Sequence, residues 1–220
     1  MSKLKVVLFD LDNTLIDRQK AALGLMGEMV DLDFPADEFD EEFRKDALDK
    51  LYNWDREGHE PKESSFGKYA AFTKIEGRDW KHYEKIWQEN LWRYTELFDQ
   101  SIETLDYLKK KYRLALLTNG SVNSQNNKVD IVNIRDYFED IIISGTYGFH
   151  KPDKRIFDIV LERLKIEADE CVYVGDALYN DIEGALNAGM HAIWAYPYIN
   201  VDTDVLCQRI YQVKDLKHIL

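Results

Sequence analysis

The sequence predicts an α/β protein, in which helices cover both faces of a parallel sheet and a helical module follows the first strand. Short continuous apolar runs recur along the chain, and helical patterns lie between the later ones. Alternation of this kind is typical of a parallel sheet built from right-handed crossovers. Residues 17–96 contain no convincing run of this type, so they predict the inserted module.

Five apolar runs are the predicted strands. The first, KVVLF at residues 5–9, leads directly into an acidic residue. The others are RLALL at 113–117, DIIIS at 140–144, CVYVG at 171–175 and AIWAY at 192–196. Runs without polar alternation indicate strands that are buried on both faces, as the strands of a parallel sheet are.

Three helices are predicted between the later runs. They span residues 101–112, 152–164 and 180–190. The first places Ile102, Leu105 and Leu108 on one face, which we expect to pack against the sheet. Pro152 stands where helices often begin. Asn180 is the expected N-cap of the third helix, with a glutamate three residues later, close to a capping box.

Residues 17–96 differ from the rest of the chain in their residue pattern. Charged and aromatic residues alternate there at helical spacing, and the segment holds four of the five tryptophans. We expect it to form a helical cap domain that overhangs the edge of the sheet, and its aromatic residues to form the core of that domain. Residues 1–16 and 97–220 would then form the core domain that contains the sheet.

The composition narrows the range of partners. The formal net charge is −12 and no block of Lys or Arg is present, which argues against a nucleic-acid or membrane partner. No apolar run approaches the ~20 residues that span a bilayer. Cys171 and Cys207 are far apart, and we expect two unpaired thiols in a reducing, cytoplasmic protein. The oligomeric state stays open.

Polar side chains follow four successive predicted strands. In chain order these residues are Asp10, Asp12, Thr118, Asn119, Lys151, Asp176 and Asp181, and Gly120 directly follows Asn119. Each alone has an ordinary explanation as a turn or helix-end residue. Ligands of open parallel sheets, however, bind outside the carboxyl ends of the strands, where these side chains would meet. Their joint placement therefore predicts a binding site at that edge.

The residue types in this set predict phosphoryl chemistry. Several carboxylates at one edge repel each other unless a hard cation lies among them, and oxygen-only ligation suits Mg²⁺. Lys151 and Thr118 offer a charge and a donor for phosphate oxygens. Backbone N–H groups at 11–13 and 119–120 could add further donors. Asp10 could attack phosphorus as a nucleophile, and Asp12 could exchange protons with the leaving group and with water.

Four motifs strengthen this interpretation. DLDNT, LLTNG, HKPDKRIF and VYVGDALYNDIEGALNAGM resemble, in order and spacing, the signature motifs of the haloacid dehalogenase-like hydrolase superfamily. The resemblance covers residues 4–16 and 100–200. It implies a Rossmann-like core, an α-helical cap inserted after the first motif, and Mg²⁺-dependent hydrolysis of a phosphomonoester.

The resemblance also implies roles for the acidic residues. Asp10 would be the nucleophile and a metal ligand. Asp12 would be the general acid and base, and would give Mg²⁺ its backbone carbonyl. Asp176 would bind the metal directly, and Asp181 would support the ion or Lys151 from behind.

The remaining motif residues would bind the substrate. By resemblance, Thr118, Asn119 and Lys151 hold the phosphoryl group. The TNG and LNAGM segments are most similar to pyrimidine nucleotidases and acylneuraminate phosphatases, which suggests a nucleoside monophosphate or a sugar phosphate as substrate. His150 is not part of the family pattern, and we interpret it as a loop residue.

Three alternative functions use similar residues. A 2-haloacid dehalogenase shares the fold and the nucleophile, but normally lacks the second acid, because a halide leaves without a proton; Asp12 argues against it. A phospho-accepting receiver domain is about half this length and takes its acids from different strands. A catalytically silent binding protein would be expected to lack some of these acids.

Overall fold

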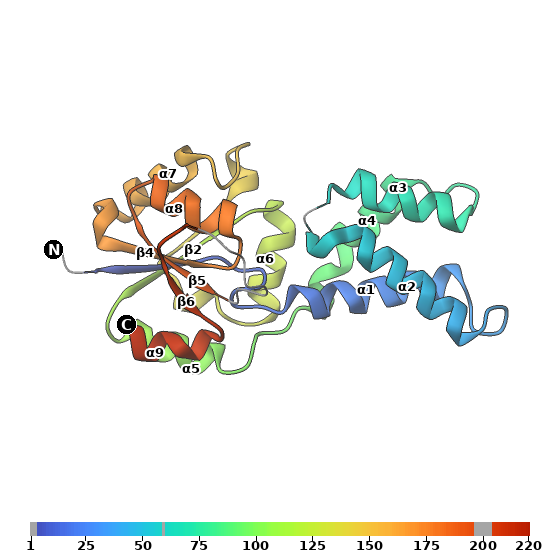
Figure 1. Ribbon diagram of the computed structural model, residues 1–220, viewed down its shortest axis with the longest axis horizontal. Helices are drawn as coiled ribbons and strands as arrows, with labels where there is room; N and C mark the ends of the chain where they lie inside the picture. The colour runs from blue at the N-terminus through green and yellow to red at the C-terminus, as the bar shows by residue number, and fades with distance from the viewer. Residues whose placement is uncertain (1–3, 59, 196–203) are drawn as a thin grey trace. The chain divides into compact units, whose positions relative to one another are not determined.

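The computed structural model describes residues 4–58, 60–195 and 204–220. The chain folds into two compact units, Met1–Asp17 with Leu97–Leu220, and Arg18–Glu96 (Figure 1). The first unit contains a sheet and the second is helical. None of the described helices is long and apolar enough to cross a bilayer.

The first unit is built on a six-stranded sheet in the order β3-β2-β1-β4-β5-β6, and all its strand pairs are parallel. The strands are β1 (Val6–Phe9), β2 (Arg113–Thr118), β3 (Asp140–Ile143), β4 (Cys171–Gly175), β5 (His191–Ala195) and β6 (Gln208–Ile210). The five predicted strands are therefore confirmed, except that Tyr196, at the end of the fifth run, lies outside the described residues.

Helices cover both faces of this sheet (Figure 1). They are α5 (Ser101–Lys109), α6 (Val122–Ile131), α7 (Lys154–Leu164), α8 (Gly184–Asn187) and α9 (Leu216–Ile219). In β1, Val6 and Leu8 join the cluster formed with α7 and α8, whereas Val7 and Phe9 join the cluster formed with α5, α6 and α9. This period of two means that both faces of the strand are apolar, as the continuous run predicts.

The expected apolar face of the helix that begins at residue 101 was partly wrong. Helix α5 buries Ser101, Thr104, Leu105 and Leu108, whereas Ile102 is 37% exposed. The two buried hydroxyls are hydrogen-bonded, because Ser101 Oγ donates to Leu15 O and Thr104 Oγ1 donates to Gln100 O. Short hydroxyl side chains with such partners tolerate burial, so the buried face turned away from the isoleucine.

Two predicted helix starts were also wrong. Helix α7 begins at Lys154 with Asp153 as its N-cap, so Pro152 lies before it. The segment around Asn180 winds into a π-helical turn, Leu178–Glu183, which precedes α8. Asp181 explains the earlier start, since its backbone N–H donates to Ala177 O and its side chain accepts from Ala177 N.

In its described residues, the second unit contains four α-helices and two short 3-10 helices. The α-helices are α1 (Arg18–Asp33), α2 (Glu41–Asp55), α3 (Lys62–Thr73) and α4 (Trp80–Asn90). Asp40 and Asp79 cap α2 and α4 by accepting backbone N–H groups. The unit has its own core, which is rich in aromatic residues. The fully buried Asp55 forms ion pairs with Arg18 and Lys62, which satisfies a charge that would otherwise be costly to bury.

Two smaller features of the first unit bear on the sequence analysis. Cys171 and Cys207 are both free thiols, as expected. Strand β6 was not predicted, because the three residues QRI carry no apolar run and two of them are exposed. Pairing with β5 therefore decides its conformation more than its own composition does.

Candidate active site

The carboxyl ends of four adjacent strands bring together the predicted polar residues. Asp10 directly follows β1, Thr118 ends β2, Lys151 lies in the segment after β3, and Asp176 directly follows β4. The backbone N–H of Asp10 donates to Val174 O at 2.9 Å, which ties the first acid to β4. The sheet order β3-β2-β1-β4 makes these four strand ends neighbours.

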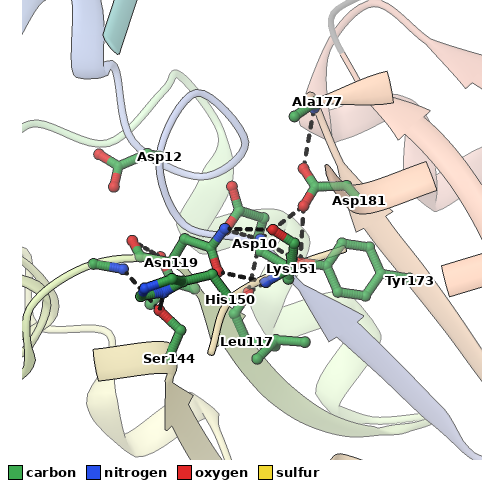
Figure 2. Close-up of polar contacts among 12 residues, drawn as sticks. Asp10, Asp12, Leu117, Asn119, Ser144, His150, Lys151, Tyr173, Ala177 and Asp181 are labelled. Carbon is green, nitrogen blue, oxygen red and sulfur yellow. Dashed lines mark hydrogen bonds and ion pairs between the residues drawn. The ribbon is translucent and has the colours of Figure 1, made fainter. Parts of the chain in front are cut away.

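Lys151 lies at the centre of the polar contacts of this site (Figure 2). Its Nζ lies 2.7 Å from Asp10 Oδ1, Asp181 Oδ1 and the Tyr173 hydroxyl, and 3.2 Å from Leu117 O. Burial alone would lower the pKa of this lysine, but the charges of Asp10 and Asp181 raise it above its usual value. The ammonium therefore stays charged between the two carboxylates.

Asp181 is held from the other side by the chain itself. Its second oxygen accepts from Ala177 N at 3.0 Å. The carboxylate packs directly over Gly175, where an added Cβ would lie 2.4 Å from Asp181 Oδ2. Only glycine permits this approach, which explains the Gly-Asp step after β4. Nearby, Trp194 Nε1 donates to Asp176 O at 2.7 Å and fixes the backbone of that acid.

Three carboxylates lie close together at the carboxyl ends of the strands. Oxygen atoms of Asp10, Asp176 and Asp181 all lie within 4.8 Å of one another. Burial raises the pKa of Asp10 to about 7, with Lys151 opposing and Asp181 adding to the shift. Burial and the charge of Asp181 also raise the pKa of Asp176. A cluster of crowded, all-oxygen donors with excess negative charge fits a hard divalent cation.

Asp12 lies apart from this cluster (Figure 2). Lys128 Nζ donates to both of its carboxylate oxygens, at 2.7 and 2.9 Å, and Gln125 Nε2 donates to Oδ2 at 2.9 Å. Asp12 is partly exposed, and both of these partners are buried in α6. The sequence places the two acids at one strand end, and the structure turns their carboxylates to different partners.

The predicted substrate-binding residues are partly engaged within the protein. Thr118 Oγ1 accepts from Gln125 Nε2 at 2.6 Å. The side chain of Asn119 makes two hydrogen bonds to the backbone of Lys151. Its Oδ1 accepts from Lys151 N at 2.9 Å, and its Nδ2 donates to Lys151 O at 3.1 Å. Asn119 therefore orients the segment that carries Lys151, and its contact with the phosphoryl group stays a prediction.

Two of the backbone donors expected from the sequence are already used. Gly120 N donates to Ser144 Oγ at 3.1 Å, and Asn13 N donates to Ile16 O at 2.9 Å. These two N–H groups have partners within the protein, and the expectation that they bind phosphate stays a prediction. In the structure both groups hold the loops that carry the site.

His150 lies in an irregular segment and is exposed, as interpreted from the sequence. Its Nδ1 is 2.6 Å from Ser144 Oγ, the same hydroxyl that accepts from Gly120 N. These contacts tie the loop after β2 to the loop that carries Lys151. His150 therefore lies beside the site and helps to hold these two loops together (Figure 2).

Sequence reasoning did not identify several residues of the site, among them Gln125, Lys128, Ser144, Tyr173 and Trp194. Tyr173 was hidden because it reads as one more apolar residue of the run CVYVG. Gln125 and Lys128 are three apart in the helix after TNG, so they share one face. A polar pair at that spacing beside a binding loop is a usable signal, although solvated helix faces carry the same pattern.

Comparison with known proteins identifies the family of the motifs. The sequence model of the haloacid dehalogenase-like hydrolases matches residues 7–195. N-acylneuraminate-9-phosphatase from Rattus norvegicus is 31% identical, over 88% of this chain and 83% of its own. Glyceraldehyde 3-phosphate phosphatase from Methanothermobacter thermautotrophicus is 32% identical, over 86% of this chain and 84% of its own.

A solved structure agrees over the whole chain. The HAD-hydrolase YfnB from Bacillus subtilis, determined bound to magnesium, superposes with a TM-score of 0.81 at 25% identity. The match covers 100% of this chain and 99% of that one. The fold and the sequence motifs therefore lead to the same group of proteins.

Proposed function

Because this chain belongs to the haloacid dehalogenase-like hydrolase family, we propose that it is a Mg²⁺-dependent phosphomonoester hydrolase that acts through an aspartyl-phosphate. One observation carries the proposal. The buried Lys151 joins Asp10, at the end of β1, to Asp181, in the π-helical turn after β4, and Asp176 lies within reach of the same point. This arrangement offers a nucleophile, a charge for phosphate oxygens and a cation site together.

In the first step, Asp10 attacks phosphorus. A carboxylate oxygen of Asp10 forms a bond to phosphorus, and the bond from phosphorus to the ester oxygen breaks. The departing alkoxide takes a proton from Asp12, and Asp12 becomes a carboxylate. Lys151, held beside Asp10 at 2.7 Å, and Thr118 bind the phosphoryl oxygens and orient the group for attack.

In the second step, water attacks the phosphorus of the aspartyl-phosphate. Asp12, now ionised, takes a proton from that water, and the bond between phosphorus and Asp10 breaks. Inorganic phosphate leaves, and both acids return to their starting states. Asp12 thus acts once as an acid and once as a base, which requires a carboxyl group that does not itself bond to phosphorus.

Mg²⁺ fits the donor set of this site. Asp10 and Asp176 would bind it through carboxylate oxygens and Asp12 through its backbone carbonyl, with Asp181 supporting Lys151 from behind. When bound, the ion would neutralise charge on the acids and on the phosphoryl group. The crowding of Asp10, Asp176 and Asp181 within 4.8 Å supports this assignment, because those charges repel without a cation.

The proposed substrate is a small phosphorylated metabolite in the cytoplasm, of the sugar phosphate or nucleoside monophosphate class. The similarity to an acylneuraminate phosphatase and a glyceraldehyde phosphate phosphatase supports a phosphorylated metabolite over a haloacid. Asp12 supports the same choice, since halide departure needs no proton donor. The formal net charge of −12 disfavours nucleic acid as the substrate.

We also propose that residues 17–96 are the cap that selects the substrate. Its separate aromatic core lets the unit vary its surface without altering the sheet. Grouped substitutions of exposed residues in this unit should change which phosphoester is preferred. They should leave hydrolysis of p-nitrophenyl phosphate mostly intact. Equal loss of all substrates would show that the unit is needed for closure or stability and not for choice.

The test of the reaction class is phosphate release from a panel of nucleotides, sugar phosphates and phosphoglycolate, with Mg²⁺ and with chelator. We expect Mg²⁺-dependent release of phosphate from at least one of these substrate classes. Chloride release from 2-chloropropionate without phosphatase activity would overturn it in favour of a dehalogenase. Stable phosphorylation without turnover would indicate a receiver-like module.

A further inference from the structure

Helix α6 buries an unusual set of side chains. Its buried residues are Gln125, Lys128 and Val129, so two of the three are polar. Lys128 is only 4% exposed and Gln125 only 2%. An ammonium at such depth strongly destabilises a protein unless a carboxylate pairs with it, whereas an apolar side chain at the same position would pack without that penalty.

The carboxylate that pairs with Lys128 is Asp12. Lys128 Nζ donates to both carboxylate oxygens, at 2.7 and 2.9 Å, so the ammonium binds the two oxygens together. The two residues are 116 positions apart in the chain, so the contact is created by the fold. The lysine side chain is 5% exposed and that of Asp12 is 20% exposed, so the acid keeps some access to solvent.

Gln125 connects the same acid to the phosphoryl-binding loop. Its Nε2 donates to Asp12 Oδ2 at 2.9 Å and to Thr118 Oγ1 at 2.6 Å. Both protons of the amide nitrogen are therefore used. The amide must face this way, because its oxygen would repel the carboxylate. One side chain thus sets the place of Asp12 relative to Thr118.

We propose that Lys128 and Gln125 are positioning residues for Asp12, and that α6 holds in place the carboxyl group that exchanges the proton during hydrolysis. This inference rests on the proposed function, in which Asp12 is the general acid and base. Neither residue is expected to touch the phosphoryl group, which Thr118 and Lys151 hold. Their loss should therefore lower kcat and leave KM nearly unchanged.

The leaving group separates positioning from a merely structural role. An alkoxide needs a proton from Asp12 in order to depart, whereas p-nitrophenolate does not. Lys128→Met removes the ammonium but keeps an unbranched side chain, so Asp12 loses its fixed position. Cleavage of an alkyl phosphate should slow by about 10²-fold, the cost of misplacing a reacting group by roughly 1 Å. The first step with p-nitrophenyl phosphate should slow much less.

Two further variants keep the test decisive. Lys128→Arg retains a cation that can donate to both carboxylate oxygens. This variant should therefore hydrolyse the alkyl phosphate at most of the wild-type rate. If Lys128→Met fails to fold, Gln125→Met supplies the same comparison of esters, because it also removes a donor to Asp12. Lys154→Met is the matched control, because it removes an exposed lysine paired with Asp158 and should leave both rates unchanged.

A double-mutant cycle with Asp12→Asn gives the result that decides the inference. If Lys128 acts through Asp12, then Lys128→Met should add little to the alkyl phosphate defect of Asp12→Asn. Full additivity, or equal slowing of the first chemical step with both esters by Lys128→Met, would overturn the inference while leaving the proposed function intact. Loss of the ester difference in Asp12→Asn alone would instead overturn the proton-transfer role of Asp12, and the inference with it.

Discussion

Two lysines pair with carboxylates at the ends of the same sheet, and their surroundings differ. Lys151 stands among Asp10 and Asp181 with Asp176 close by, so one positive charge faces three acids. Lys128 pairs with a fourth acid, Asp12, which also accepts from the neutral amide of Gln125.

The difference between these two groups separates two tasks. The group around Lys151 carries excess negative charge, which makes it the place for a cation and an anionic phosphoryl group. The group around Lys128 is balanced in charge, and its hydrogen bonds fix one carboxylate in position. We therefore expect changes around Lys151 to affect binding and bond making, and changes around Asp12 to affect proton transfer.

The largest effect is expected from Asp10→Asn. The amide keeps the shape but removes the attacking charge, so turnover should fall by about 10⁴-fold or more. The fold should persist, because Lys151 still pairs with Asp181 at 2.7 Å. Steady-state rates and a thermal melt measure the two effects. Asp158→Asn, which changes an exposed acid on α7, is the control. Near wild-type turnover in Asp10→Asn would move the nucleophile elsewhere.

Removal of the metal should abolish activity almost as completely. Chelation with EDTA leaves three crowded carboxylates that repel a phosphate, and added Mg²⁺ should restore the rate. Asp176→Ala should weaken Mg²⁺ binding most, because this acid is the metal ligand that has no other role in the proposed reaction. Mg²⁺ titrations of activity and calorimetry provide the measurement. Full activity in chelator would contradict the cation assignment.

A smaller, selective effect is expected from Asp12→Asn. Hydrolysis of an alkyl phosphate should slow by about 10²–10⁴-fold, the usual contribution of general acid catalysis. With p-nitrophenyl phosphate, the first step should suffer less, but breakdown of the intermediate should still be slow. Rapid mixing should therefore show a burst of p-nitrophenol and then slow turnover. Equal slowing with both esters, and no burst, would assign Asp12 to the metal or the loop.

The smallest effect concerns the pH dependence of metal binding. Burial raises the pKa of Asp10 to about 7, so without metal its carboxyl is mostly protonated at pH 6 and mostly ionised at pH 8. Protons compete with the ion for an ionised ligand, so affinity should rise with pH, by roughly tenfold between these values from Asp10 alone. Calorimetry with Mg²⁺ at both pH values tests this. Constant affinity would show that Asp10 is already ionised at pH 6.

Much of the acidic cluster could be predicted because its residues follow apolar runs directly. Asp10 and Asp176 each come immediately after a strand, and strand ends of a parallel sheet meet at one edge. Lys151 could be assigned to the same edge by the same argument. Its hydrogen bond to Tyr173 could not, because a tyrosine in a buried strand shows its hydroxyl only after the fold is known.

The surroundings of Asp12 lay beyond sequence reasoning for a physical reason. The spacing of two places Asp10 and Asp12 at one strand end, but the side-chain direction depends on which partner each acid finds. Lys128 is a helix residue far along the chain, and its spacing from Gln125 fits a solvated helix face as well as a buried one. The helix starts at Lys154 and Leu178 were missed similarly, since Asp153 and Asp181 redirect the backbone through their own side chains.

The most direct test of this division is to trap the intermediate. Asp12→Asn is mixed with p-nitrophenyl phosphate and Mg²⁺, quenched in acid during the burst, and its peptides are examined by mass spectrometry. The account predicts one added phosphoryl group on the peptide that carries Asp10, and none when Asp10→Asn is combined with it. A phosphoryl group on another residue, or none at all despite a burst of p-nitrophenol, would contradict a reaction in which Asp10 attacks and Asp12 transfers protons.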